Sequence, residues 1–146
     1  MAKKEVIIKS QCPVENKIYG LIRCIAHEME AETTKCLKSY GLSNTQLSIL
    51  EALDNCGMHK EMTVNQIKEC LLDESPNVSR SLNKLMERKL IQKEQDKKDK
   101  RIVKIRITED GTKAHRDAAL AITKNKGKPK LTKEEVKKLF ALLMKV

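Results

Sequence analysis

The feature that most constrains this chain is a helix-start pattern that recurs three times, at residues 42–47, 62–67 and 131–136. In each copy a Ser or Thr is followed three positions later by Gln or Glu, and one apolar residue precedes and one follows the pair. The two polar side chains can cap the backbone of a first helical turn reciprocally, while the two apolar side chains pack together across it. The sequence therefore predicts a chain of helices with three fixed starting points.

The first part of the chain contains one long amphipathic segment. Apolar residues recur at three- and four-residue steps between Pro13, which suits a first helical turn, and Gly41, which suits a helix end. This spacing predicts one long helix over 13–40. The preceding residues 1–12 are expected to form a loose arm.

The middle of the chain changes from helical to extended spacing. Ser75 and Pro76 open a further helix, with Ser75 as its N-cap. After that helix, residues 90–93 and 103–107 are predicted to be two strands, joined by the charged loop 94–101. A further helix, a lysine-rich linker and a short last helix are expected to follow.

The core of this chain must be aliphatic, because only 2% of the residues are aromatic although 40% are hydrophobic. A chain of 146 residues has the length of one domain. The element order is a long helix, three short helices, a hairpin and two helices, which predicts a mainly α fold with a small β-hairpin wing, that is, a winged helix-turn-helix. The expected organisation is a single domain over 1–146, with the winged helix-turn-helix lobe at 42–108 between the first helix and the helices at 109–146.

Positive charge is concentrated in one part of the chain. The sequence has 30 Lys and Arg against 20 Asp and Glu, a net charge of +10, and residues 77–107 hold 11 of these basic residues against 4 acidic ones. Such an excess favours polyanions, with nucleic acid first and an anionic membrane second. The plain alternative is a solvated basic surface without a partner.

The helix that begins at Pro76 is expected to read DNA. Its apolar row must face the core, and the opposite side then presents Arg and Lys for guanine edges and phosphates, Asn for adenine, and Ser for phosphates or bases. That side consists of Asn77, Ser79, Arg80, Asn83 and Lys84.

The segment after this helix resembles the wing of the MarR family of transcription regulators. The likeness rests on Asp99, Lys100, Arg101, Ile107, Thr108 and Gly111. It implies that Arg101 is the wing-tip arginine that enters the minor groove and that Asp99 orients it. A narrow minor groove concentrates negative potential, which suits an inserted arginine. The wing residues expected at the DNA are Lys97, Lys98, Asp99, Lys100 and Arg101.

The resemblance extends over roughly residues 15–145 and implies a homodimer. In the MarR family the first and last helices pair between subunits, which makes 13–40 and 109–146 the expected dimerisation helices. A helix of about 28 residues spans ~42 Å, longer than one small domain, and two-fold symmetry would set two recognition helices ~34–36 Å apart. One departure is Lys89, which stands where the family usually has Gly and would be strained in a left-handed conformation.

These observations predict a sequence-specific transcription regulator that binds double-stranded operator DNA. The resemblance adds a repressor that is relieved by a small aromatic ligand or by an oxidant. Two other classes stay open. One is a winged-helix protein–protein interaction module with an incidental basic face, and the other is an RNA-binding module, against which the scarcity of aromatic residues for base stacking argues.

The remaining chemistry of the sequence is sparse. Five cysteines without a CxxC pair argue against a disulfide framework and a typical zinc site. Cys24, beside Arg23 and His27, is the candidate redox sensor, and its alternative role is that of a small buried apolar residue. No motif predicts catalysis, so no enzyme, cofactor or metal ion is expected. No signal peptide or membrane span stands out, and the expected location is the cytoplasm, away from membranes.

Overall fold

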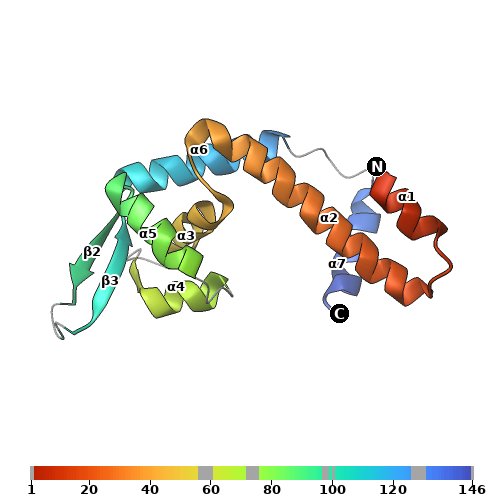
Figure 1. Ribbon diagram of the computed structural model, residues 1–146, viewed down its shortest axis with the longest axis horizontal. Coiled ribbons are helices and arrows are strands. Elements are labelled where there is room, and N and C mark those ends of the chain that lie inside the picture. The colour runs from red at the N-terminus through yellow and green to blue at the C-terminus, as the bar shows by residue number, and fades with distance from the viewer. Residues whose placement is uncertain are drawn as a thin grey trace.

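The computed structural model describes residues 2–55, 61–71, 76–96, 99, 101–125 and 131–145. Within these ranges the chain forms, in order, α1 (Ala2–Lys9), α2 (Val14–Leu37), the 3-10 helix η1 (Lys38–Tyr40), α3 (Asn44–Asn55), β1 (Glu61–Thr63), α4 (Val64–Leu71), α5 (Pro76–Glu87), β2 (Ile91–Gln95), β3 (Val103–Ile107), α6 (Glu109–Asn125) and α7 (Lys133–Leu143). Figure 1 shows an elongated molecule with β2 and β3 at one end and α1, the start of α2 and α7 at the other. The predicted mainly α fold with a small β wing is confirmed.

Capping boxes begin three of the helices where the sequence pattern predicts them. The Gln46 N–H donates to Ser43 Oγ at 3.2 Å, and the Ser43 N–H donates to Gln46 Oε1 at 2.9 Å. Thr63 and Gln66 form the same pair of bonds at 3.3 and 2.8 Å, and the box at 131–136 caps α7. These contacts are made within one helical turn, which is why a local pattern reveals them.

A three-stranded antiparallel sheet forms the wing, whereas the sequence predicted only two strands. In the strand order β1-β3-β2, Met62 lies opposite Ile105, and Ile105 lies opposite Lys93. β1 has three residues directly before α4, so it is too short to show the alternation that marks a strand. β2 runs on to Gln95, beyond the predicted 90–93, because its last two residues pair with β3.

The lobe around the sheet holds an aliphatic core, as predicted. Its members come from the end of α2, from α3 to α6 and from the sheet, and include Leu37, Ile49, Leu50, Leu53, Ile67, Val78, Leu82, Leu85, Ile105, Ile107 and Ala118. Outside this lobe, most of α2 and all of α7 stay at the surface. No helix within the described ranges is both long and apolar enough to cross a membrane.

The N-terminal segment is a helix, so the expectation of a loose arm over 1–12 was wrong. α1 folds back along α2 (Figure 1), where Ile7 lies against Gly20 and Lys4 forms an ion pair with Glu28. A Cβ at Gly20 would lie 3.3 Å from Ile7 Cγ2, so the missing side chain lets the two helices approach closely. An isolated helix of eight residues is not stable in water. Contacts with α2 therefore hold α1, and a local sequence pattern cannot show them.

Two helix ends share one backbone geometry but differ in the residue that adopts it. Gly41 after η1 and Lys89 after α5 have φ angles of 61° and 58°. At each end the next residue donates its N–H to a carbonyl five positions back, as Leu90 does to Leu85 at 2.9 Å. This left-handed cap favours Gly, because a Cβ is strained there. Lys89 therefore carries the strain that its place in the wing pattern suggested.

Lys89→Gly is expected to raise the free energy of unfolding by about 0.5–1 kcal/mol, because it relieves left-handed strain at the cost of the extra conformational entropy that Gly loses on folding. Lys89→Ala is the matched control, since it removes the same charge but keeps Cβ. Urea denaturation compares the two variants with the wild type. Equal stability of the Gly and Ala variants would show that the cap is unstrained.

Candidate nucleic-acid interface

α4 and α5 are the two helices of the predicted helix-turn-helix, and α5 is the predicted recognition helix. Val78, Leu82 and Leu85 are 0%, 3% and 0% exposed, so one row of α5 is fixed in the core. The other side presents all five predicted residues to solvent, namely Asn77, Ser79, Arg80, Asn83 and Lys84. Ser75, the expected N-cap of this helix, lies outside the described residues. The structure thus gathers the predicted recognition residues on one exposed surface.

A groove of about 870 Å³ runs between α5 and the start of α3. Arg80 and Lys84 line it from α5, Lys38 lines it from η1, and Thr45 lines it from the first turn of α3. Glu87 adds one carboxylate to the lining, so the three cations leave an excess of positive charge that suits the phosphates of a nucleic-acid backbone. Lys38 and Thr45 were not predicted from the sequence, because only tertiary packing brings η1 and α3 next to α5.

Arg88 also lines this groove, but its guanidinium is engaged within the protein. Nη1 donates to the carbonyl oxygen of Gly41 at 2.6 Å, and Nη2 donates to that of Tyr40 at 3.1 Å. These bonds tie the end of α5 to the turn between α2 and α3. The positive charge of Arg88 therefore has a structural role in the lobe.

The sheet of the wing carries a network of five charged side chains. The Glu61 carboxylate accepts hydrogen bonds from Lys104 Nζ and Arg106 Nη2, both at 2.8 Å. Lys104 Nζ also lies 2.8 Å from Asp96 Oδ2, and Arg106 Nη2 lies 3.1 Å from Glu94 Oε2. The hydrogen bonds from the two cations lower the pKa of Glu61, and those to Asp96 and Glu61 raise the pKa of Lys104. Two of the basic residues counted for the wing are thus balanced by carboxylates of the same sheet.

At the wing tip, Asp99 acts on the backbone of Arg101. Its Oδ1 accepts the Arg101 N–H at 2.9 Å, and its carbonyl oxygen accepts the Ile102 N–H at 3.0 Å. Asp99 and Arg101 are both exposed. This bond fixes the backbone of Arg101, and the expectation that Asp99 orients Arg101 toward DNA stays a prediction. The predicted wing residues Lys97, Lys98 and Lys100 lie outside the described residues.

Cys24, the candidate redox sensor, is half-buried on α2. Its Sγ lies 3.8 Å from Glu28 Oε1, and it shares an open cavity of about 570 Å³ between α1 and α2 with Arg23 and His27. The redox role of Cys24 stays a prediction. Among the residues that the structure describes, no group of His, Cys, Asp and Glu side chains is arranged to hold a metal ion.

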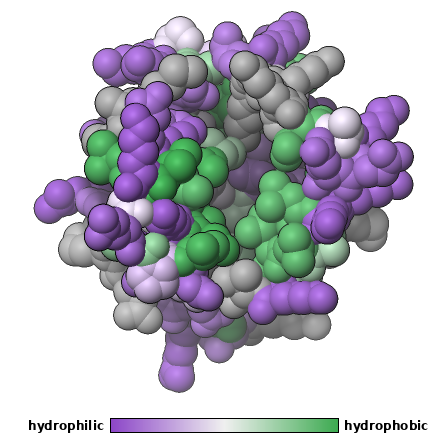
Figure 2. Space-filling view, turned by 90° about the vertical axis from the view of Figure 1, so that its right-hand side faces the viewer, coloured by the Kyte–Doolittle hydropathy of each residue, from purple (hydrophilic) through white to green (hydrophobic). Residues whose placement is uncertain are grey.

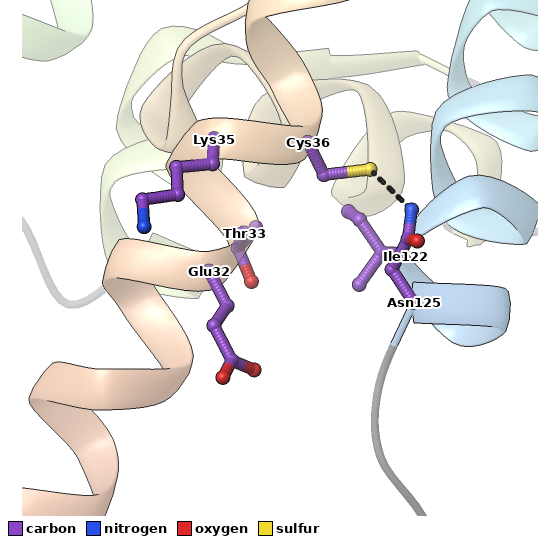
Figure 3. Close-up of a pocket in the computed structure, with 6 residues that line it drawn as sticks. All are labelled: Glu32, Thr33, Lys35, Cys36, Ile122 and Asn125. Carbon is purple, nitrogen blue, oxygen red and sulfur yellow. Dashed lines mark hydrogen bonds between the residues drawn. The ribbon is translucent and has the colours of Figure 1, made fainter.

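A second cavity, of about 420 Å³, lies between the later part of α2 and α6 (Figure 3). Glu32, Thr33, Lys35 and Cys36 line it from α2, and Ile122 and Asn125 line it from α6. Asn125 Nδ2 donates to Cys36 Sγ at 3.6 Å across the gap between the two helices. The cavity is therefore lined both by α2, which extends to the far end of the molecule, and by α6, which packs in the lobe.

The family model for the transcriptional regulators SarA and Rot matches residues 33–117, more than half of the chain. The chain belongs to the SarA/Rot family of transcriptional regulators. The matched segment includes the end of α2, the whole winged helix-turn-helix and the first part of α6. No curated protein matches this SarA/Rot-family sequence.

Solved structures place the regulator among winged helix-turn-helix proteins. MepR of Staphylococcus aureus in complex with DNA is 27% identical over 86% of this chain and 92% of that chain, with a TM-score of 0.66. The organohalide-sensing regulator RdhR with bound 2,4-dichlorophenol is 25% identical over 92% and 80%, with a TM-score of 0.77. A MarR-family regulator of Rhodococcus is 19% identical over 92% and 94%, with a TM-score of 0.76, and shows the fold alone. The predicted MarR-like fold is confirmed.

Arg88→Ala is expected to destabilise this SarA/Rot-family regulator without changing the salt dependence of its DNA binding. The variant loses two hydrogen bonds to carbonyls but no phosphate contact, and only a lost phosphate contact flattens the slope of log affinity against log salt, by ~0.9 each. Lys84→Ala is the matched control and should flatten that slope. Titrations at several salt concentrations make the comparison, and a flatter slope for Arg88→Ala would place Arg88 at the DNA.

Proposed function

We propose that this SarA/Rot-family regulator binds specific sites in double-stranded DNA as a homodimer and represses transcription there. The observation that carries the proposal is the exposed side of α5, where Arg80 and Lys84 line a cationic groove and Asn83 lies on the same face. Such side chains suit the base edges and phosphates of a major groove. MepR, solved in complex with DNA, has the same fold.

The wing is proposed to supply a second contact with DNA. Arg101 is exposed at its tip, and the turn that carries it is held by Asp99. We place Arg101 in the minor groove, whose negative potential suits an inserted arginine. Lys97, Lys98 and Lys100 belong to the same proposed contact as residues of the wing loop.

The homodimer is supported by an apolar surface at the other end of the molecule (Figure 2). This apolar surface consists of exposed side chains of α1, α2 and α7, among them Val6, Ile18, Ile22, Ile25, Met29, Val136, Leu139, Phe140 and Leu143. α7 buries none of its residues, and a lone helix of 11 residues is not stable in water. A second copy that covers this surface would stabilise α7, and two-fold symmetry would present two copies of α5 to one face of DNA.

We propose further that a small aromatic ligand or an oxidant relieves repression. The cavity lies between α2, which extends to the apolar end of the molecule, and α6 of the lobe (Figure 3). A ligand bound there would therefore change the position of the lobe relative to α2. RdhR, whose fold is the same, has been solved with 2,4-dichlorophenol bound. For oxidation, Cys24 on α2 is the candidate.

Arg80→Ala is expected to weaken binding to a selected DNA site by about 1–3 kcal/mol and to relax the preference at one base pair of each half-site, the result of losing a bidentate contact to a base. Arg116→Ala is the matched control and should bind like the wild type, because it removes an exposed arginine of α6 whose Nε lies 3.8 Å from Asp54 Oδ2 within the protein. Fluorescence titrations with the selected duplex and with random duplex measure both effects. An equal loss on the two duplexes would reduce Arg80 to a phosphate contact.

Ile25→Glu is expected to convert the dimer to a monomer at micromolar concentration, because a carboxylate without a partner would be buried in the contact between two apolar surfaces. Ile102→Glu is the matched control, since Ile102 has a similar exposed fraction, 40% against 44%, but lies in the wing. Sedimentation measures the assembly. A stable monomer that binds a palindromic site with full affinity would contradict the dimer.

A further inference from the structure

We infer that Glu61, Lys104 and Asp96 are positioning residues that hold the wing tip, and with it Arg101, in the geometry that reaches DNA; this rests on the proposed contact of Arg101 with DNA. None of the three needs to touch DNA itself. Their charged groups bond to one another and to the backbone of the tip. Together with Asp99, we call these residues the wing relay.

The lower part of the wing relay starts on β1, the strand of the wing that directly precedes α4. Glu61 lies on β1 two residues before Thr63, which caps α4, so its backbone is fixed to the lobe. Its Oε1 accepts a hydrogen bond from Lys104 Nζ at 2.8 Å, and the same Nζ lies 2.8 Å from Asp96 Oδ2. The Lys104 ammonium is therefore held between the carboxylate of Glu61 at the base of the wing and that of Asp96 near its tip.

The upper part of the wing relay runs from Asp96 to the arginine. Asp96 Oδ1 accepts the Asp99 N–H at 3.1 Å, and the Asp96 N–H donates to the carbonyl oxygen of Ile102 at 2.9 Å. Asp99 Oδ1 in turn accepts the Arg101 N–H at 2.9 Å. The contacts thus form a continuous series from the Glu61 carboxylate to the backbone of Arg101.

The short first strand explains why the wing needs this support. β1 pairs with β3 from Arg106 only as far as Lys104, so the described part of the hairpin beyond Lys104 has no third strand beside it. Two-stranded ribbons twist more strongly than wider sheets and are marginally stable alone. Lys104 lies where the supported and unsupported parts meet, and there its side chain joins β1 to Asp96.

Asp96→Asn separates positioning from plain electrostatics by the sign of its effect. The variant removes a negative charge near the proposed DNA site, so electrostatics alone predicts tighter binding. It also breaks the ion pair with Lys104, so the wing relay predicts a less ordered Arg101 and weaker binding. Glu94→Gln is the matched control, because it removes the same charge from the same wing. Glu94 contacts Arg106 and Gln92, so the contacts from Glu61 through Lys104 to Asp96 do not pass through it.

The test measures the affinity of each variant at one salt concentration for a duplex selected with the purified protein and for a random duplex. We expect Asp96→Asn to bind the selected duplex about tenfold more weakly, a loss typical of a broken polar network, and the random duplex no more weakly than the wild type. Adding Arg101→Ala to Asp96→Asn should weaken binding no further than Arg101→Ala alone. In the free protein, the amide NMR signals of Asp99 and Arg101 should shift in Asp96→Asn but not in Glu94→Gln.

Two results would overturn the wing relay alone. The first is that Asp96→Asn binds the selected duplex as tightly as the wild type or more tightly, while Arg101→Ala binds it more weakly. The second is an equal loss of affinity in Asp96→Asn and Glu94→Gln, because general damage to the hairpin would then explain the loss. Wild-type affinity of Arg101→Ala is a different outcome. It would remove the proposed contact of Arg101 with DNA, and the role of the wing relay with it.

Discussion

The burial of one side of α5 is the constraint on which the rest of this structure depends. Val78, Leu82 and Leu85 pack in the lobe core with side chains of α3, α4 and the sheet. A helix is a rigid cylinder, so burial of one row decides the direction of every other row. Arg80 and Lys84 consequently face outward, and they do so beside the start of α3, where the cationic groove forms.

The basic residues of this protein are divided between two tasks. Arg88, Lys104 and Arg106 bond to carbonyls or carboxylates of their own chain, and these bonds set the end of α5 and the shape of the wing. Arg80 and Lys84 are exposed at the groove instead. The charge summed over residues 77–107 therefore overstates the positive charge of the wing, because Glu61, which pairs with Lys104 and Arg106, lies outside that stretch. Arg88 keeps its charge, but its hydrogen bonds to carbonyls of the α2–α3 turn hold it against the lobe.

Most of the fold was predictable because its signals are local. The capping boxes at 42–47 and 62–67 fix the starts of α3 and α4 through contacts within one turn, and the periodic apolar row of α5 reveals its exposed side. α1 and β1 were not predicted, since each is short and is held by residues far along the chain, as Ile7 is by Gly20. The same limit applies to the site, where the exposed side of α5 was predicted but the position of Lys38 was not, because packing alone brings Lys38 to the groove.

The claim that two copies of this chain read a symmetric site in duplex DNA is tested most directly by genomic-fragment selection with the purified protein, followed by footprinting. We expect the enriched fragments to share a two-fold symmetric sequence, with two protected major-groove segments one helical turn, or ~34–36 Å, apart. The apolar surface of α1, α2 and α7 would then lie on the two-fold axis. Enriched fragments without two-fold symmetry, or no enrichment above random DNA, would contradict the claim.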